Sequence, residues 1–210
     1  RRGLDRYRSV IEDAGFGVET HVVRGTPYRR LNGLAETVRA DLSVVGSRGQ
    51  SPLKNRVIGS TARNLARTTV VPLLVNRVER AADDRDVLRE HLFRRILFAT
   101  DFSEHADRAF DAFSYLRHAA EEATLVHVRS PKDDGPDAGV DPEELLAERA
   151  NTLESWGIET RTEVRRGDPA EEILAAEAAM TPSTVLVGSK GRSRIRRLLP
   201  GSVSEEVVAR

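Results

Sequence analysis

Two glycine-rich turns contain the residues of this chain that could contact an anion. In the second turn, the apolar run 184–187 predicts a buried strand that ends at Gly188, and Ser202 predicts the start of a helix. Gly191 and Gly201 lie between them. Glycine permits positive φ and close approach of the backbone, and the free N–H groups of a helix N-terminus favour negative charge. The spacing therefore predicts a phosphate-binding turn.

The first turn repeats this pattern 142 residues earlier in the chain. It contains the same residue types in the same order, at Gly46, Gly49, Gly59 and Ser60. The same offset relates Arg24-Gly25-Thr26-Pro27 to Arg166-Gly167-Asp168-Pro169, and Gly15 to Gly157. A constant offset without gaps indicates an internal duplication.

The helix starts near these turns carry capping signals. Ser202 and Glu205 have the spacing of a capping box, which predicts Ser202 as an N-cap. Asp168 is followed by Pro169 and Glu171, which predicts a second strong helix start.

Helical and strand patterns alternate along the chain. In the first copy we expect helix 4–14, strand 18–23, a helix from Pro27, strand 42–45, helix 60–67 and edge strand 69–75. In the second we expect strand 96–99, a helix from Ser103 to about His118, strand 124–128, helix 142–156, strand 160–164, a helix after Asp168, strand 184–187 and a final helix. This alternation predicts an α/β fold with parallel strands and right-handed crossovers.

Length and composition suit two small domains, with the first copy at 1–78, a charged linker at 79–93 and the second copy at 94–210. Acidic and basic residues balance at 33 each, which disfavours nucleic acid or an anionic membrane as the main partner. The absence of cysteine excludes disulfides and fits a reducing cytoplasm. The longest apolar run, 70–75, is too short to span a bilayer.

The two copies are unequally complete. Residue 1 corresponds to 143, so the first copy has no counterpart of 94–142, and the second has none of 69–78. Because a parallel sheet without its central strands would expose apolar faces, we expect the missing strands in residues beyond this chain, which begins with Arg1 and not Met, or in a partner chain.

Together these features resemble the universal stress protein family. The pattern G-x2-G-x9-G-S follows V-L-V-G, and I-L-F-A-T-D-F-S (96–103) opens the second copy. The resemblance covers nearly the whole chain as a tandem pair and is closest to the ATP-binding branch. It implies an open parallel five-stranded sheet with helices on both faces, flavodoxin- or Rossmann-like, with nucleotide at the carboxyl ends of the strands.

On the phosphate side of the site, the resemblance implies contacts from the glycine turn and the following helix. Gly188 and Gly191 would line the ribose and phosphates, and Lys190 between them would reach a phosphate. The positions at the helix start would donate to the phosphates, namely Gly201, Ser202 and Val203.

On the nucleoside side, the resemblance implies that Asp101 accepts a hydrogen bond from ribose or adenine, with Thr100 beside it. Val128 would offer its backbone to adenine, and Val187 would line the site. The implied ligand is ATP, with or without Mg²⁺. In the first copy only four positions can be assigned, Gly46, Gly49, Gly59 and Ser60, because Asp101 and Val128 have no counterpart there.

Each assignment has a structural alternative. The run 101–104 fits a capping box in which Asp101 only caps a helix, and the glycines could form turns that bind nothing. The arginines at 192, 194, 196 and 197 suit a solvated basic loop. His127 and His118 lack partners at metal-ligand spacing, so we expect core packing for one and a helix C-terminal contact for the other.

The leading hypothesis is a cytoplasmic, ATP-binding stress-response protein acting as a nucleotide-dependent switch or dimerisation module, as an intramolecular pseudo-dimer or a homodimer. The sequence contains no G-x4-G-K-[ST] loop and no recognisable catalytic motif, so at most slow ATP hydrolysis is expected. One alternative is a nucleotide-free interaction module that uses strand 69–75 for dimer contacts. Another is an adenylating enzyme, which would need a catalytic motif that the sequence does not show.

Overall fold

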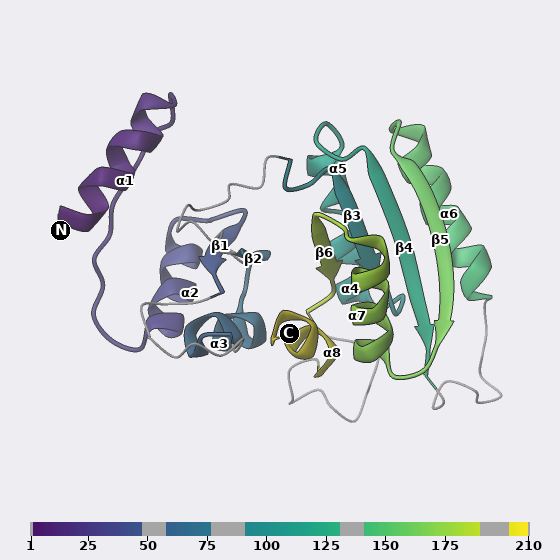
Figure 1. Cartoon of the computed structure of the whole chain (residues 1–210). Coiled ribbons are helices and arrows are strands. Elements are labelled where there is room, and N and C mark those ends of the chain that lie inside the picture. Colours follow the sequence, from purple (N-terminus) through teal and green to yellow (C-terminus); the bar gives the residue numbers. More distant parts are fainter. Residues whose placement is uncertain (1, 48–57, 77–90, 131–140, 190–201, 210) are drawn as a thin grey trace, which may run out of the picture.

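The structure is a computed structural model that describes residues 2–47, 58–76, 91–130, 141–189 and 202–209 (Figure 1). Its described strands form two parallel sheets, one with the order β5-β4-β3-β6 and one with the order β1-β2. Parallel strands joined by helices confirm the predicted α/β fold. Most of the predicted linker 79–93 lies outside the described residues, which resume at 91.

The second copy forms the larger sheet. Its elements are β3 (Arg95–Ala99), α4 (Glu104–Phe110), α5 (Phe113–Leu116), β4 (Glu122–Arg129), α6 (Pro142–Ser155), β5 (Glu159–Arg166), α7 (Pro169–Met180), β6 (Thr184–Val187) and α8 (Ser202–Ala209). Numbered within this copy, the strand order is 3-2-1-4, which is the Rossmann order and not the flavodoxin order. The described residues of this copy therefore supply four strands of the five that the resemblance implies.

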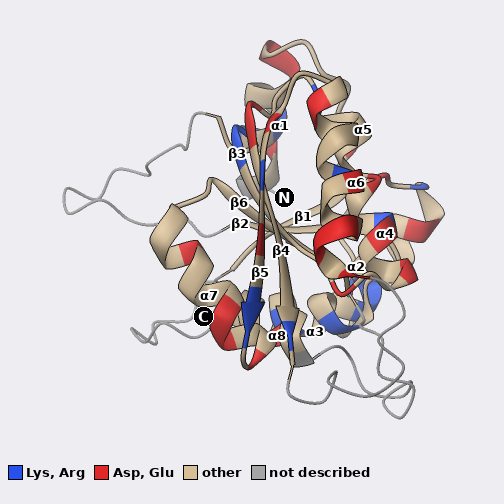
Figure 2. Cartoon of the chain, turned by 90° about the vertical axis from the view of Figure 1, so that its right-hand side faces the viewer, with Lys and Arg blue, Asp and Glu red and all other residues tan. Residues whose placement is uncertain are grey.

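Helices cover both faces of this sheet (Figure 2). Alternate residues of β3 point to opposite faces, so Ile96 and Phe98 pack against α4, α5 and α6, whereas Leu97 and Ala99 pack against α7 and α8. The first of these cores is aromatic, and the ring of Phe98 lies 6.0 Å from that of Phe113 at 90°. Because both faces are covered, the central strand β3 reads as a continuous apolar run in the sequence.

The first copy forms the smaller sheet. Its elements are α1 (Arg2–Asp13), α2 (Pro27–Thr37), β1 (Ser43–Gly46), α3 (Ser60–Thr68) and β2 (Leu73–Asn76). β1 pairs in parallel with β2, with Val45 opposite Val75. The strand predicted at 69–75 begins only after Pro72, which lacks the N–H group that a ladder needs.

The strand predicted at 18–23 does not form, although its counterpart in the second copy is β5. β5 pairs along its whole length with β4, for which the chain contains no first-copy counterpart. Without a neighbouring strand, the N–H and C=O groups of 18–23 have no ladder to join, and Val22 is 70% exposed. The alternating pattern is present, but its pairing partner is not.

The single helix predicted to end near His118 is instead two helices, α4 and α5, separated by a turn at Asp111 and Ala112. At this joint the hydrogen bonds shorten from i−4 to i−3, as in Ser114 N–H to Asp111 O at 3.1 Å. The Ser114 hydroxyl also donates to the Asp111 carbonyl, at 2.7 Å. This serine competes with the helical ladder, which explains why the apolar periodicity alone did not predict the break.

The two copies contact each other through equivalent helices, since α3 packs against α8. The offset of 142 residues relates Ser60 to Ser202, the first residues of these helices. An ion pair bridges the two helices, with Arg67 Nε 3.6 Å from a carboxylate oxygen of Glu205.

Candidate functional site

The carboxyl ends of three neighbouring strands converge at one edge of the larger sheet. Ala99 of β3 lies opposite Val126 of β4 on one side and Val187 of β6 on the other. The connection that leaves β3 runs over the α4 face, whereas α8, which follows β6 in the chain, packs beside α7 on the other face. Helices that leave in opposite directions open a crevice at this point, and in open α/β sheets that crevice is where ligands bind.

The turn after β3 carries Thr100 and Asp101. Thr100 is buried, and its N–H group still belongs to the ladder, donating to Val126 O at 2.9 Å. Its hydroxyl accepts from Phe102 N–H at 3.0 Å, and the Asp101 carboxylate accepts from Ser103 N–H at 3.1 Å. These bonds close a tight turn at the edge of the sheet.

The alternative in which Asp101 is the N-cap of the next helix is wrong. The N-cap of α4 is Ser103, whose hydroxyl accepts from Ala106 N–H at 3.3 Å. Asp101 lies two residues earlier and stabilises the turn before the cap. Its carboxylate is therefore placed at the end of the strand, as the family resemblance implies for a ligand contact.

Val128 is positioned by the end of β3. Val126 O accepts from Thr100 N–H, so the main-chain groups of Val126 and Val128 face the β3 side of β4. β3 has ended at the level of Val128, and the described ladder between the two strands stops at Val126. The side chain of Val128 is buried in the core under α7. Only its main chain is therefore available at the edge.

Gly188 follows β6 and is required by packing. A Cβ at this position would lie 2.9 Å from Ala106 N and 3.0 Å from His105 C, both backbone atoms of α4. Such contacts are closer than real Cβ atoms make, so any side chain here would push α4 away from β6. The sequence suggested that Gly188 allows close approach of a ligand. The structure shows that Gly188 also allows α4 to pack closely against the sheet.

The start of α8 lies close to the end of β6. Ser204 is buried, and its hydroxyl donates to Ser189 O at 3.4 Å. This bond ties together the two ends of the segment that contains Lys190, Gly191 and Gly201, all three of which lie outside the described residues. A helix N-terminus is thereby held beside the carboxyl end of a strand, an arrangement that favours anions.

The start of α8 carries three residues with predicted roles, Ser202, Val203 and Glu205. Ser202 is the first described residue of the helix, and the capping geometry predicted for it lies outside the described residues. Val203 packs against the core under α7, which leaves its main chain for any ligand contact. Glu205, predicted to complete the capping box, contacts Arg67 of the first copy.

The first copy closes its glycine turn in a similar way. Gly59 is the N-cap of α3, Ser60 is the first residue of that helix, and Gly59 N–H donates to Ser47 O at 2.8 Å. Gly46 ends β1, and Gly49 lies outside the described residues. The residues of this chain contain no first-copy counterpart of β3 and β4, so only these first-copy positions are assigned.

Three residues near the site have contacts that the sequence did not predict. His127 is buried, which confirms the expected core packing, but its Nδ1 also lies 2.9 Å from Thr100 O. Its ring lies 4.7 Å from that of Phe102, over which the Arg149 guanidinium lies at 5.0 Å. The available signal was the alternation of β4, which places His127 on the face opposite to Val128.

The described residues contain no cluster of three or more His, Cys, Asp or Glu side chains that could hold a metal ion. Nor is any described helix long and apolar enough to cross a membrane.

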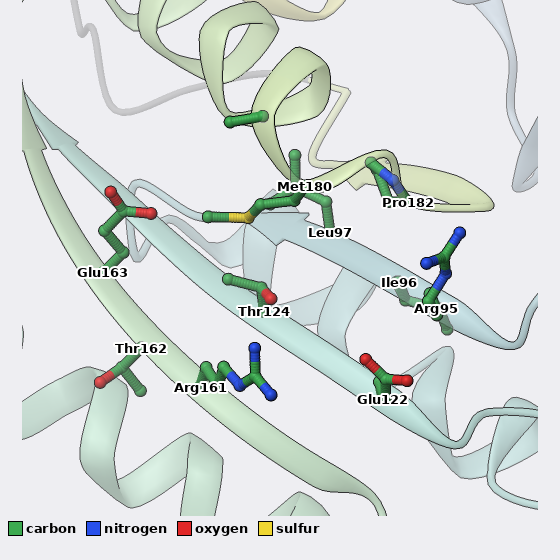
Figure 3. Close-up of a pocket in the computed structure, with 11 residues that line it drawn as sticks. Arg95, Ile96, Leu97, Glu122, Thr124, Arg161, Thr162, Glu163, Met180 and Pro182 are labelled. Atoms are coloured by element: carbon green, nitrogen blue, oxygen red, sulfur yellow. The ribbon is translucent and has the colours of Figure 1, made fainter.

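A groove of about 500 Å³ lies at the opposite end of the sheet, between the amino-terminal halves of the strands and the end of α7 (Figure 3). Three of its charged side chains have local partners, since Arg95 donates to Thr181 O at 2.9 Å, Arg161 donates to Glu159 at 2.9 Å, and Glu163 accepts from Arg165 at 3.0 Å. The groove is distant along the strands from every predicted site residue. Its lining comprises Arg95, Ile96, Leu97, Glu122, Thr124, Arg161, Thr162, Glu163, Ala179, Met180 and Pro182.

The sequence pattern of the universal stress protein family matches residues 3–77 and 92–210. The chain belongs to this family. The two matched segments correspond to the two copies of the repeat, so the resemblance in the sequence and the tandem arrangement are confirmed.

Relatives match the chain over most of its length. A universal stress protein of Mycolicibacterium smegmatis is 28% identical over 225 residues, covering 99% of this chain and 72% of the relative. Another, from Methanocaldococcus jannaschii, is 27% identical over 139 residues, covering 57% of this chain and 78% of the relative. The crystal structure of a universal stress protein from Archaeoglobus fulgidus has a TM-score of 0.70 at 26% identity, covering 98% of this chain and 70% of that one.

Proposed function

We propose that the second copy binds an adenine nucleotide, with ATP as the leading candidate, at the carboxyl ends of β3, β4 and β6. The observation that supports this proposal most is the convergence of three strand ends beside the start of α8. β3 and β6 end at Ala99 and Val187, opposite each other, β4 continues past them to Arg129, and Ser204 ties α8 to the residue after Gly188. Membership of the universal stress protein family adds to this support.

In this proposal the phosphates bind at the glycine turn and the nucleoside binds over β3 and β4. Free N–H groups at the start of α8 and close backbone approach at Gly191 favour the phosphates, with Lys190 as an additional cation. Asp101 accepts from the ribose or adenine, and Val128 offers main-chain groups to the base. Mg²⁺ would be held chiefly by the phosphates.

The proposed role is a nucleotide-dependent switch in the stress response, located in the cytoplasm. ATP would bind between β6 and the start of α8, and α8 also forms the contact with α3 between the copies. A ligand shifts such an equilibrium only by its differential affinity for the two states, so the oligomeric state or the contact between copies should change with ATP. Hydrolysis should be slow, because no general base or metal-holding carboxylate pair is recognisable in the sequence.

The test is extraction of bound nucleotide from the purified protein, followed by calorimetric titration of ATP against wild type and Gly191→Val. A branched side chain at Gly191 should block approach of the phosphates and weaken binding at least about tenfold, the scale of a lost charge-assisted contact. Gly49→Val, at the equivalent position of the first copy, is the matched control and should leave affinity unchanged. We expect one ATP per chain. If wild type binds no adenine nucleotide, the proposal fails.

A second candidate function is a nucleotide-free interaction module. The contact of α3 with α8, bridged by Arg67 and Glu205, favours it, because side chains of the two copies form this contact directly. Light scattering with and without ATP separates the two candidates. An oligomeric state that is identical in both conditions, in a protein that binds no nucleotide, would favour the interaction module.

A further inference from the structure

The turn that carries Asp101 is held by residues on the face opposite to α7. Phe102 follows Asp101, and its ring lies 4.7 Å from the ring of His127 with a tilt of 31°. His127 is 8% exposed and lies on β4 between Val126 and Val128, whose side chains face α7. Its ring therefore contacts the turn from the α4–α6 side.

His127 also contacts the main chain of this turn directly. Its Nδ1 lies 2.9 Å from Thr100 O. A carbonyl oxygen can only accept, so Nδ1 must carry the proton in this hydrogen bond. The tautomer of His127 is thereby set by the residue directly before Asp101.

The backbone of the turn is one that a side chain rarely adopts. Phe102 has φ of +56°, in the left-handed region that disfavours every residue except glycine. A bulky residue remains in this conformation only where its surroundings determine it. Here the surroundings are His127 on β4 and Arg149 on α6, which both contact the Phe102 ring.

Arg149 is itself anchored. Its Nη2 donates to the Asp107 carboxylate at 2.6 Å and its Nη1 to Leu145 O at 3.2 Å, while its guanidinium lies 5.0 Å from Phe102. The side chain is 17% exposed. The contacts to Phe102 therefore join three elements, β4, α4 and α6, to the single turn that bears Asp101.

We propose that His127 is a positioning residue for the nucleotide site: through Thr100 and Phe102 it holds Asp101 where its carboxylate meets the nucleoside. This inference rests on the proposed nucleotide binding. Without His127 the turn would be free to relax, because the Phe102 ring would lose its stacking partner and Thr100 O would lose its hydrogen bond. The positive φ of Phe102 would then be less well supported. Affinity should then fall at the nucleoside end and not at the phosphate end.

The test is calorimetric titration of wild type and three variants with ATP, AMP and inorganic tripolyphosphate. His127→Phe keeps a ring but removes the donor, His127→Gln keeps an N–H donor but removes the ring, and His127→Ala removes both. We expect His127→Ala to weaken ATP and AMP binding equally, by about tenfold, as for coupled neighbouring residues. The affinity for tripolyphosphate should be unchanged. His127→Phe and His127→Gln should each lose less ATP affinity than His127→Ala does.

A double-mutant cycle with Asp101→Ala distinguishes positioning from general stability. If His127 acts through Asp101, His127→Ala should have no further effect on ATP affinity in the Asp101→Ala background. Leu125→Val, two residues earlier on the same face of β4, is the control. It should lower the melting temperature without changing ATP affinity.

Each outcome has a distinct meaning. If wild type binds no nucleotide, the proposed function fails and the positioning role fails with it. The proposed function survives alone if wild type binds ATP and His127→Ala binds equally well. Additive losses in the double-mutant cycle, or an equal loss for tripolyphosphate, would also overturn the positioning role.

Discussion

Equivalent residues in the two copies have very different surroundings. Leu153 on α6 is fully buried, whereas its counterpart Ile11 on α1 is 42% exposed. Ile158 is 1% exposed, and its counterpart Phe16 is 68% exposed. Both second-copy residues pack against β4 and β5, whereas the chain contains no counterpart of β4 for the first copy. Similar side chains therefore form a core in one copy and a surface in the other.

The backbone conformation of the copies agrees much more closely. Gly15 and Gly157 have φ of +89° and +83° after equivalent helices, and Gly25 and Gly167 have φ of +124° and +146° before the next ones. These turns form with or without the sheet beside them. The comparison separates structure that depends on neighbours in sequence from structure that depends on neighbours in space.

The largest expected difference is in core truncation. Leu153→Ala should lower the free energy of unfolding by about 3 kcal/mol, because it removes a fully buried side chain. Ile11→Ala should change it by less than about 0.5 kcal/mol, as exposed positions usually do. Urea unfolding followed by circular dichroism measures both, and fluorescence of Trp156, the chain's only tryptophan, reports on the second copy. A large loss for Ile11→Ala would mean that this face of α1 is covered in solution.

A smaller difference is expected at the two strand-end glycines. Gly188→Ala should cost about 2 kcal/mol, because its Cβ would overlap the backbone of α4. Gly46→Ala should cost less than about 1 kcal/mol, since the chain has no first-copy counterpart of α4 and the change lies within the usual range for strand residues. Thermal unfolding of the two variants checks this. Equal costs would contradict the packing explanation for Gly188.

The smallest difference is expected at the helix starts after Gly25 and Gly167. Asp168 accepts from Ala170 N–H at 3.0 Å and Glu171 N–H at 3.2 Å, so Asp168→Ala should cost about 1 kcal/mol. Thr26 occupies the equivalent N-cap position without a side-chain bond, so Thr26→Ala should cost less than about 0.5 kcal/mol. Denaturant midpoints would show the contrast. An equal loss for Thr26→Ala would indicate a cap that forms in solution.

These comparisons also show how much could be predicted from the sequence. Asp168 and Pro169 predicted the start of α7, because capping is a local property. The apolar run 96–99 predicted a buried strand, and its pairing on both sides confirms it. The strand predicted at 18–23 was wrong, because a strand also needs a neighbour.

At the candidate site, too, some features could be predicted from the sequence and others could not. Asp101, Val128 and Gly188 were predicted from motifs, and the structure places all three at one edge of the sheet. The packing of Gly188 on Ala106 and the hydrogen bond from His127 to Thr100 were not predicted. Both join residues that are tens of positions apart, and no local pattern records such a contact.

By itself, the sequence determined the duplication, the alternation of helices and strands and the positions of the turns, because these follow from spacing, apolar periodicity and the φ preferences of single residues. Only the tertiary structure decided the Rossmann strand order and which residues hold the Asp101 turn. Burial and hydrogen bonding depend on which strands become neighbours, and that pairing is established only when the whole sheet forms.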